Sequence, residues 1–266
     1  MIELICVDLD GTLLSNEKDI SEKNIEILRL AKDKGIEVVL ASGRRYGSIH
    51  PYTKILGFDC PIIAYSGSYI RYSSEDIPFF HKKMSWEYTA ELIDLMIDKV
   101  DLIGFYLDDK FHIQEENKRS RMYEYRTSMK SKVVPHLSGF LREIKEDPTR
   151  VFILSETLGE SGLYYELSKH FAGRLDFVSS WSSFLEAGAL GVSKGIALRF
   201  LAEKYGWNLK NAVAFGDQDN DIPAFDVCGA SYAMGNATDL VKEKADFVAP
   251  GNQDDGVAVI LERLMK

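Results

Sequence analysis

Short apolar runs separated by amphipathic stretches dominate the first part of the chain. Apolar runs at 2–7 and 36–41, each broken by one glutamate, and at 61–65 have the pattern of strands buried on both faces of a sheet. Between the first two runs, residues 21–34 place apolar side chains on one helical face and end at Gly35. Strands that alternate with helices predict a parallel sheet covered on both faces.

A different pattern occupies the middle of the chain. A helical stretch at 86–100 precedes two strand-like runs, 102–107 and 111–114, which a polar turn joins as in an antiparallel hairpin. Further elements follow without the parallel rhythm, namely a strand at 151–154, a helix at 161–171 and strands at 175–179 and 184–187. This block predicts an inserted domain of the α+β type.

The parallel rhythm returns in the last part of the chain, with a helix at 194–205 and apolar runs at 212–215, 231–234 and 247–248. The expected fold class is therefore α/β, a Rossmann-like parallel sheet core with helices on both faces plus an inserted α+β domain. The expected core comprises 1–82 and 188–266, and the expected insertion comprises 83–187.

Composition narrows the class of protein. The 266 residues are 45% hydrophobic and 27% charged, the balance of a globular protein. A net charge of -9 argues against nucleic acid as a partner. No apolar run approaches the roughly 18 residues of a membrane span, and we expect no secretory signal. Three cysteines without a CxxC pair indicate reduced thiols, so we expect a cytoplasmic protein that meets no membrane; its oligomeric state stays open.

Two carboxylates, Asp8 and Asp10, directly follow the first predicted strand. Open α/β sheets bind ligands at the carboxyl ends of their strands. One carboxylate can accept a phosphoryl group there, while a second can protonate a leaving oxygen and later activate water. An Asp-Gly turn that merely ends a strand has the same pattern. A calcium loop is excluded because Leu13 stands where an EF-hand requires glycine.

Two further segments carry groups that suit an anion. Ser42 and Gly43 end the second predicted strand, where a hydroxyl and an amide can bind phosphate oxygens, although a helix N-cap serine is the alternative. Lys194 stands in a first helical turn, where the helix dipole disfavours a cation. A bound anion would remove that conflict, and a solvated surface lysine is the alternative.

The segment 216–221 gathers three carboxylates and two amides after the strand at 212–215. Such hard oxygen ligands suit Mg²⁺. A polar loop is the alternative, whereas an EF-hand is excluded because Ile222 and Cys228 replace its glycine and glutamate. All four clusters fall at predicted strand ends or at the adjoining helix start, so we expect them to form one site.

In this order the four clusters resemble the motifs of the haloacid dehalogenase-like phosphohydrolases. Residues 8–14 are similar to the first motif, Ser42 to the second, Lys194 to the third and 216–221 to the fourth. The large insertion between the second and third motifs is similar to the cap of the Cof-type subfamily, as are the segments 191–195, 233–237 and 255–258. The resemblance implies that the insertion is a cap that selects the substrate.

The resemblance also implies an activity and residue roles. It implies a Mg²⁺-dependent phosphatase of small phosphorylated metabolites, such as sugar phosphates or phosphorylated cofactors, with an aspartyl-phosphate intermediate. Asp8 would be the nucleophile and Asp10 the acid/base. The metal ligands would be Asp8, the backbone carbonyl of Asp10, and Asp217, with support from Asp221. The phosphoryl oxygens would be held by the backbone of Leu9 and by Ser42, Gly43, Lys194 and Asn220.

Specificity does not follow from the resemblance. Residues 65–68, Tyr-Ser-Gly-Ser, stand near the expected substrate entrance where relatives often have an Asn-Gly pair. Arg44 and Arg45 are candidates for a second anionic group of the substrate, with a solvated pair as the alternative. Trp181 is a candidate for stacking on a substrate ring, with a packed aromatic as the alternative.

Three other functions compete with the phosphatase. Phosphoryl-transferring ATPases of this kind have threonine in place of Asp10, which argues against them. Mutases usually carry their cap between the first two motifs, where this chain has only a short span. A non-catalytic sensor of phosphorylated metabolites would be expected to lose the nucleophile or a metal ligand first, and this chain keeps both.

Overall fold

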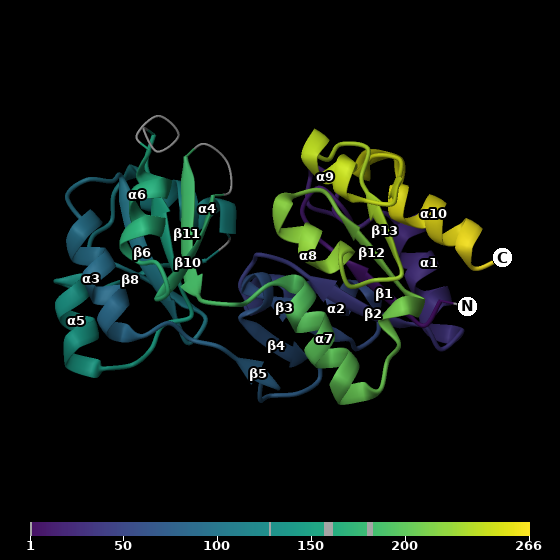
Figure 1. Cartoon of the computed structure of the whole chain (residues 1–266), viewed down its shortest axis with the longest axis horizontal. Coiled ribbons are helices and arrows are strands. Elements are labelled where there is room, and N and C mark those ends of the chain that lie inside the picture. The colour runs from purple at the N-terminus through teal and green to yellow at the C-terminus, as the bar shows by residue number, and fades with distance from the viewer. Residues whose placement is uncertain (1, 128, 157–161, 180–182) are drawn as a thin grey trace. The chain divides into compact units, whose positions relative to one another are not determined.

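The chain forms two compact units in the computed structural model, shown in Figure 1. The core unit combines Met1–Phe80 with Ser193–Lys266, and the inserted unit is the continuous stretch His81–Val192. The structure describes residues 2–127, 129–156, 162–179 and 183–266. That the two units divide catalysis from substrate selection stays a prediction.

An eight-stranded sheet forms the centre of the core unit, in the order β14-β13-β12-β1-β2-β3-β4-β5. The strands are β1 (Leu4–Val7), β2 (Glu37–Ala41), β3 (Pro61–Ala64), β4 (Tyr69–Tyr72), β5 (Phe80–His81), β12 (Ala212–Gly216), β13 (Ala230–Ala233) and β14 (Phe247–Val248). Pairing is parallel from β14 to β3, and β4 lies antiparallel to β3. The predicted parallel α/β core is confirmed, whereas β4 and β5 were not predicted.

Helices cover both faces of this sheet (Figure 1). On one side α1 packs on α2, α10 and β2, and on the other α8 packs on α7, α9 and β12. Their bounds are α1 (Glu22–Asp33), α2 (Tyr46–Leu56), α7 (Lys194–Tyr205), α8 (Ile222–Phe225), α9 (Asp239–Lys244) and α10 (Gly256–Leu264). The described part of this unit also contains the 3-10 turns η2 (Leu209–Asn211), η3 (Asp219–Asp221) and η4 (Asn252–Asp254), and the short turn η1 (Tyr65–Gly67), whose residues have positive φ.

An N-cap hydrogen bond and buried side-chain packing fix the position of the first turn of α7. The hydroxyl of Ser193 accepts a hydrogen bond from the N–H of Ile196 at 3.2 Å and so satisfies one of the free donors of the helix terminus. Apolar residues of α7, including Leu198 and Leu201, pack with Leu4 of β1 in one buried cluster. The cap and the packing together hold the first turn of α7 at the sheet.

A six-stranded sheet, in the order β10-β11-β9-β6-β7-β8, forms the inserted unit. The strands are β6 (Leu102–Leu107), β7 (Lys110–Ile113), β8 (Lys132–Val133), β9 (Arg150–Leu154), β10 (Leu175–Ser179) and β11 (Phe184–Ala189). All neighbours pair antiparallel except β7 and β8. The predicted hairpin of β6 and β7 is present, and its turn residues Asp108 and Asp109 both have positive φ.

The helices of the inserted unit are α3 (Trp86–Met96), α4 (Lys118–Thr127), α5 (Leu137–Ile144) and α6 (Leu163–His170). Side chains of α3, α5 and α6 share one buried apolar cluster with β6, β9 and β11. The sequence pattern indicates α3 and α6 but misses α4 and α5, and α3 ends at Met96 rather than at residue 100. β11 runs two residues past the predicted end at 187.

All three cysteines are free thiols, as predicted. Within the described ranges, no helix is both long enough and apolar enough to cross a membrane.

Candidate active site

The end of β1 places Asp8 at the carboxyl edge of the core sheet. Its N–H donates to the carbonyl of Phe215 at 3.1 Å, which extends the parallel pairing with β12 by one residue. Its carbonyl accepts from the N–H of Leu13 at 3.2 Å, so the chain turns back immediately. The Asp8 side chain is buried, which is rare for a carboxylate without a partner.

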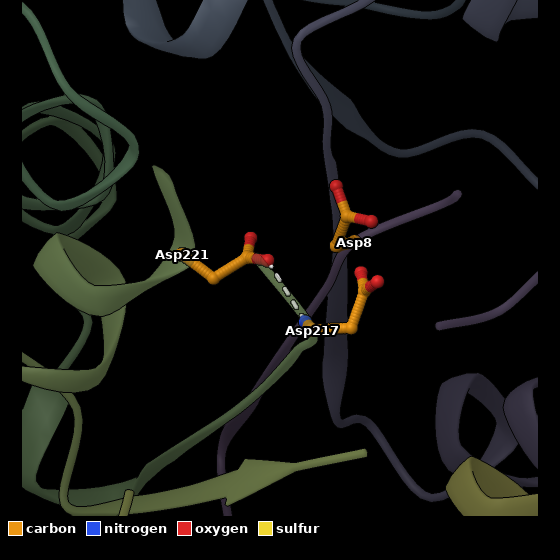
Figure 2. A group of neighbouring side chains, drawn as sticks. All are labelled: Asp8, Asp217 and Asp221. Atoms are coloured by element: carbon orange, nitrogen blue, oxygen red, sulfur yellow. Dashed lines mark hydrogen bonds between the residues drawn. The ribbon is translucent and has the colours of Figure 1, made fainter. Parts of the chain in front are cut away.

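The loop after β12 is built around the carboxylate of Asp221. Its Oδ2 accepts from the N–H groups of Asp217 and Gln218, both at 3.0 Å. Gly216 is required beside it, because a Cβ there would lie 2.3 Å from the Cγ of Asp221. These contacts hold Asp217 at the end of β12, beside Asp8 on the neighbouring strand (Figure 2).

The buried carboxylates of Asp8, Asp217 and Asp221 converge, with one oxygen of each lying within 4.8 Å of the others. Figure 2 shows them drawn together from two neighbouring strands and the following turn. Lys194, the first residue of α7, donates from Nζ to Asp8 Oδ1 at 2.5 Å and to Asp221 Oδ1 at 2.6 Å. Three carboxylates against one ammonium leave an excess of negative charge that a divalent cation fits.

Hydrogen bonding sorts the three carboxylates into two roles. Asp221 uses Oδ1 on Lys194 and Oδ2 on two backbone N–H groups, so both of its oxygens are engaged. Among the described residues, Asp217 accepts only from the side chains of Thr12 at 3.2 Å and Gln218 at 3.0 Å. Asp8 and Asp217 could therefore hold a metal ion more readily than Asp221, whose oxygens are engaged by Lys194 and the loop.

Burial shapes the acidity of the cluster. Burial raises the pKa of Asp8 well above its usual range, Lys194 opposes that rise, and the charges of Asp221 and Asp217 add to it. Burial likewise raises the pKa of Asp217 to about 6, against the hydrogen bond from Gln218. Burial disfavours the charged form of Lys194, but the carboxylates of Asp221 and Asp8 outweigh it and raise the lysine pKa. The three carboxylates therefore carry more negative charge than Lys194 alone can balance.

The side chain of Asp10 binds Arg44 and is not one of the three converging carboxylates. The guanidinium donates from Nε to Oδ2 at 2.6 Å and from Nη2 to Oδ1 at 2.5 Å, a bidentate pair in which Asp10 keeps 54% of its side-chain surface exposed. Arg44 also donates to the Tyr52 hydroxyl at 3.2 Å. The guanidinium expected to reach a second substrate anion is therefore engaged by Asp10 in this structure.

The other predicted anion ligands surround the same sheet edge. Ser42 is buried at the end of β2 and accepts from the N–H of Arg44 at 3.2 Å. It is not an N-cap, because α2 begins after Arg45, which makes no side-chain capping bond. The backbone N–H of Leu9 donates to no group in the described parts of the chain, so it is available to an anion.

The sequence of this chain is similar to those of known proteins. The family model of haloacid dehalogenase-like hydrolases matches residues 5–261. The chain belongs to the haloacid dehalogenase-like hydrolases. It is 31% identical to a 5-amino-6-(5-phospho-D-ribitylamino)uracil phosphatase of Bacillus subtilis (strain 168), over 97% of this chain and 93% of that protein. The prediction of the family, made from four short motifs, is confirmed.

Two further relatives support the same class of enzyme. A pyridoxal phosphate phosphatase of Escherichia coli (strain K12) is 29% identical, over 96% of each chain. The crystal structure of TM0651 from Thermotoga maritima aligns with a TM-score of 0.88 at 31% identity, covering 99% of this chain and 97% of that one. Within the haloacid dehalogenase-like hydrolases, the predicted class of phosphoric monoester hydrolase is therefore confirmed.

The haloacid dehalogenase-like core brings most of the predicted residues together and leaves three apart. Asp10 and Arg44 pair beside the cluster, and Arg45 lies half-buried at the start of α2. Trp181 lies outside the described residues, so its predicted stacking stays a prediction. The residues assembled around the carboxylates, whose individual roles stay predictions, are Asp8, Leu9, Ser42, Gly43, Lys194, Asp217, Asn220 and Asp221.

Supporting residues of the site were missed from the sequence. Thr12 and Gln218 donate to Asp217, and Asn236 donates from Nδ2 to the carbonyl of Gly11 at 2.8 Å. Asn252 donates from Nδ2 to the carbonyl of Leu14 at 2.9 Å. Thr12 and Gln218 lie inside the recognised motifs and Asn236 inside the recognised segment 233–237, whereas Asn252 lies in no recognised segment. The two asparagines brace the loop after β1 from more than 200 positions away.

Gly11→Ala should lower kcat/KM by roughly a hundredfold, in line with the cost of misplacing a reacting group by about 1 Å. Gly11 has φ +76°, and a Cβ there would lie 2.3 Å from Asp217 Oδ2, so the carboxylate must move. Gly35→Ala is the matched control, because Gly35 has φ +79° with nothing within 4 Å. Both variants strain a left-handed backbone, so thermal unfolding should show a loss of stability in each. Equal activities would contradict the placement of Asp217.

Proposed function

We propose that the protein is a Mg²⁺-dependent phosphatase of small phosphomonoesters that acts through an aspartyl phosphate on Asp8. The observation that carries the proposal is the buried cluster of three carboxylates around Lys194 at the carboxyl edge of the sheet. Asp8 and Asp217 would hold the Mg²⁺, with the backbone carbonyl of Asp10 as a further ligand. The ion would supply positive charge for the phosphoryl oxygens.

The residues would divide the reaction as follows. A carboxylate oxygen of Asp8 attacks the phosphorus, the bond to the leaving oxygen breaks, and the carboxylic acid of Asp10 protonates that oxygen. Asp10 then takes a proton from water, whose oxygen attacks the aspartyl phosphate and releases inorganic phosphate and the Asp8 carboxylate. The phosphoryl oxygens would be held by the Leu9 N–H, Ser42, Gly43, Lys194 and Asn220.

The pairing of Asp10 with Arg44 adds a step to this scheme. The guanidinium of Arg44 engages both carboxylate oxygens of Asp10. The first step requires an Asp10 oxygen at the leaving group, so Arg44 would have to release Asp10 when substrate binds. An anionic group on the substrate could then take over Arg44.

The substrate would be a small phosphorylated metabolite. This is supported by relatives whose names specify a phosphorylated ribitylaminouracil and pyridoxal phosphate, both of which are phosphate esters that also carry a ring. The inserted unit, His81–Val192, would select among such compounds. The protein would act in the cytoplasm. A panel of sugar phosphates and phosphorylated cofactors, scored for phosphate release, tests both the activity and the substrate class.

Removal of divalent ions should abolish phosphate release, and Mg²⁺ should restore it. The carboxylates of Asp8 and Asp217 repel each other and the incoming phosphate until a cation neutralises them. The measurement is phosphate release from an active panel compound after exhaustive chelation, then after addition of Mg²⁺. A thermal unfolding scan of the chelated protein shows whether it is still folded. Full activity after chelation, by a folded protein, would contradict the metal requirement.

A further inference from the structure

A left-handed turn follows β3 in the core unit. Three consecutive residues have positive φ, with values of 49° for Tyr65, 53° for Ser66 and 115° for Gly67. Glycine adopts this conformation freely, whereas a residue with a Cβ does so at a cost in free energy. Such strain persists only where the surroundings hold it, and it gathers at binding and catalytic sites. The strain therefore indicates that the turn does more than connect two strands.

Contacts tie this turn to the motifs of the site. Its backbone N–H groups donate to the carbonyl of Ser42 at 3.0 Å and to that of Arg44 at 2.9 Å. Gly67 packs so closely on the residue before Lys194 that a Cβ would lie 2.4 Å from the carbonyl oxygen of Ser193. The turn thus lies between the second motif and the start of α7. Hydrogen bonds fix its position against the motif, and close packing fixes it against α7.

The side chain of Ser66 lies inside the site rather than at an entrance. It is 9% exposed, and its Oγ accepts from Nδ2 of Asn220 at 3.4 Å. The same Oγ lies 3.4 Å from the position that a Cβ on Gly43 would occupy. Gly43 and Asn220 are two of the residues proposed above to bind the phosphoryl group, so Ser66 lies between them.

The hydroxyl of Ser66 has a donor left over. A serine hydroxyl offers one hydrogen and two acceptor positions, and Asn220 occupies one acceptor position. In the parts of the chain that the structure describes, no group accepts the Ser66 hydrogen. Burying a donor without an acceptor costs free energy, which an anion bound between Gly43 and Asn220 would recover.

We propose that Ser66 is a phosphoryl-binding residue, whose hydroxyl donates to a phosphoryl oxygen while it accepts from Asn220. This inference rests on the proposed phosphatase function. The strained turn places the hydroxyl against the part that all substrates share, so Ser66 contributes to phosphate affinity and not to the choice of the organic group. A hydrogen bond to a charged acceptor is stronger than one between neutral groups.

Ser66→Ala tests the proposal, since it removes the hydroxyl and keeps both Cβ and the backbone conformation. With Mg²⁺ present, the inhibition constant of inorganic phosphate should rise by roughly tenfold to a hundredfold. The value of kcat/KM should fall by a similar factor for every active compound of the panel. Ser68→Ala is the matched control, because Ser68 is a fully buried serine of the same segment whose hydroxyl has no hydrogen-bond partner among the residues that the structure describes. It should bind phosphate as the unaltered protein does.

Ser66→Gly separates binding from folding. Glycine removes the hydroxyl and relieves the left-handed backbone, so the melting temperature should hold or rise while phosphate inhibition weakens as in Ser66→Ala. Unchanged inhibition by phosphate in both variants would overturn the proposal, and so would losses that differ widely among substrates. If the unaltered protein neither binds phosphate nor releases it from any compound, the proposed function itself fails.

Discussion

Asp8→Asn should abolish phosphate release, with a loss of at least ~10⁴-fold in kcat, the scale seen when an enzyme loses its nucleophile. The amide has the same shape as the carboxylate but is a far poorer nucleophile, and it cannot be phosphorylated to the same intermediate. The buried Asp8 carboxylate, beside Asp217 and Lys194, is the group that this change removes. Steady-state phosphate release from an active panel compound measures the effect.

The control for this variant must separate chemistry from folding. Asp33→Asn removes one negative charge from an exposed position in the last turn of α1 and should leave turnover unchanged. Thermal unfolding should show that Asp8→Asn is folded, because Lys194 keeps its bond to Asp221. Near-normal turnover by Asp8→Asn would assign the nucleophile to another residue.

Asp10→Asn should lower activity by an amount that depends on the leaving group. An alkoxide leaving group of a sugar phosphate needs a proton, so its transfer should slow by roughly 10²–10⁴-fold. Nitrophenolate leaves without a proton, so phosphorylation of Asp8 by nitrophenyl phosphate should slow much less. Single-turnover phosphorylation with both compounds measures the difference.

This design also distinguishes proton transfer from positioning. Arg44 holds Asp10 through two hydrogen bonds, and Asp10→Asn removes the negative charge from that pair. If Asp10 acts only by positioning Arg44 or the metal, both compounds should slow equally, and the acid/base role would be withdrawn. Hydrolysis of the aspartyl phosphate should slow as well, so the variant should accumulate phosphoenzyme after a burst.

Regular patterns made the core predictable from the sequence. Strands β1, β2 and β12 are apolar except for Glu37 at the start of β2, and each is followed by polar residues whose types suit phosphate or metal. Because the carboxyl ends of parallel strands share one edge, the sequence could bring Asp8 and Asp217 together across more than 200 positions. The convergence of the carboxylates followed from topology rather than from any local signal.

Other elements had no such signal. Helix α4 carries five charged residues among ten, so no apolar stripe reveals it. The bidentate pair of Arg44 with Asp10 and the contact of Ser66 with Asn220 depend on side-chain directions that spacing does not encode. From the sequence, residues 65–68 differed from relatives near the expected substrate entrance. The Tyr-Ser-Gly-Ser sequence did not predict that the backbone at Ser66 is left-handed.

The central claim, a phosphoryl group carried by Asp8, is tested most directly by rapid quenching of a single turnover followed by peptide mass spectrometry. The Asp10→Asn protein is the best source, since its second step should be slow. We expect the mass of one phosphoryl group on the peptide that contains Asp8, and its absence from the same peptide of the Asp8→Asn protein. Stoichiometric phosphate release with no phosphorylated peptide at any quench time would contradict the account.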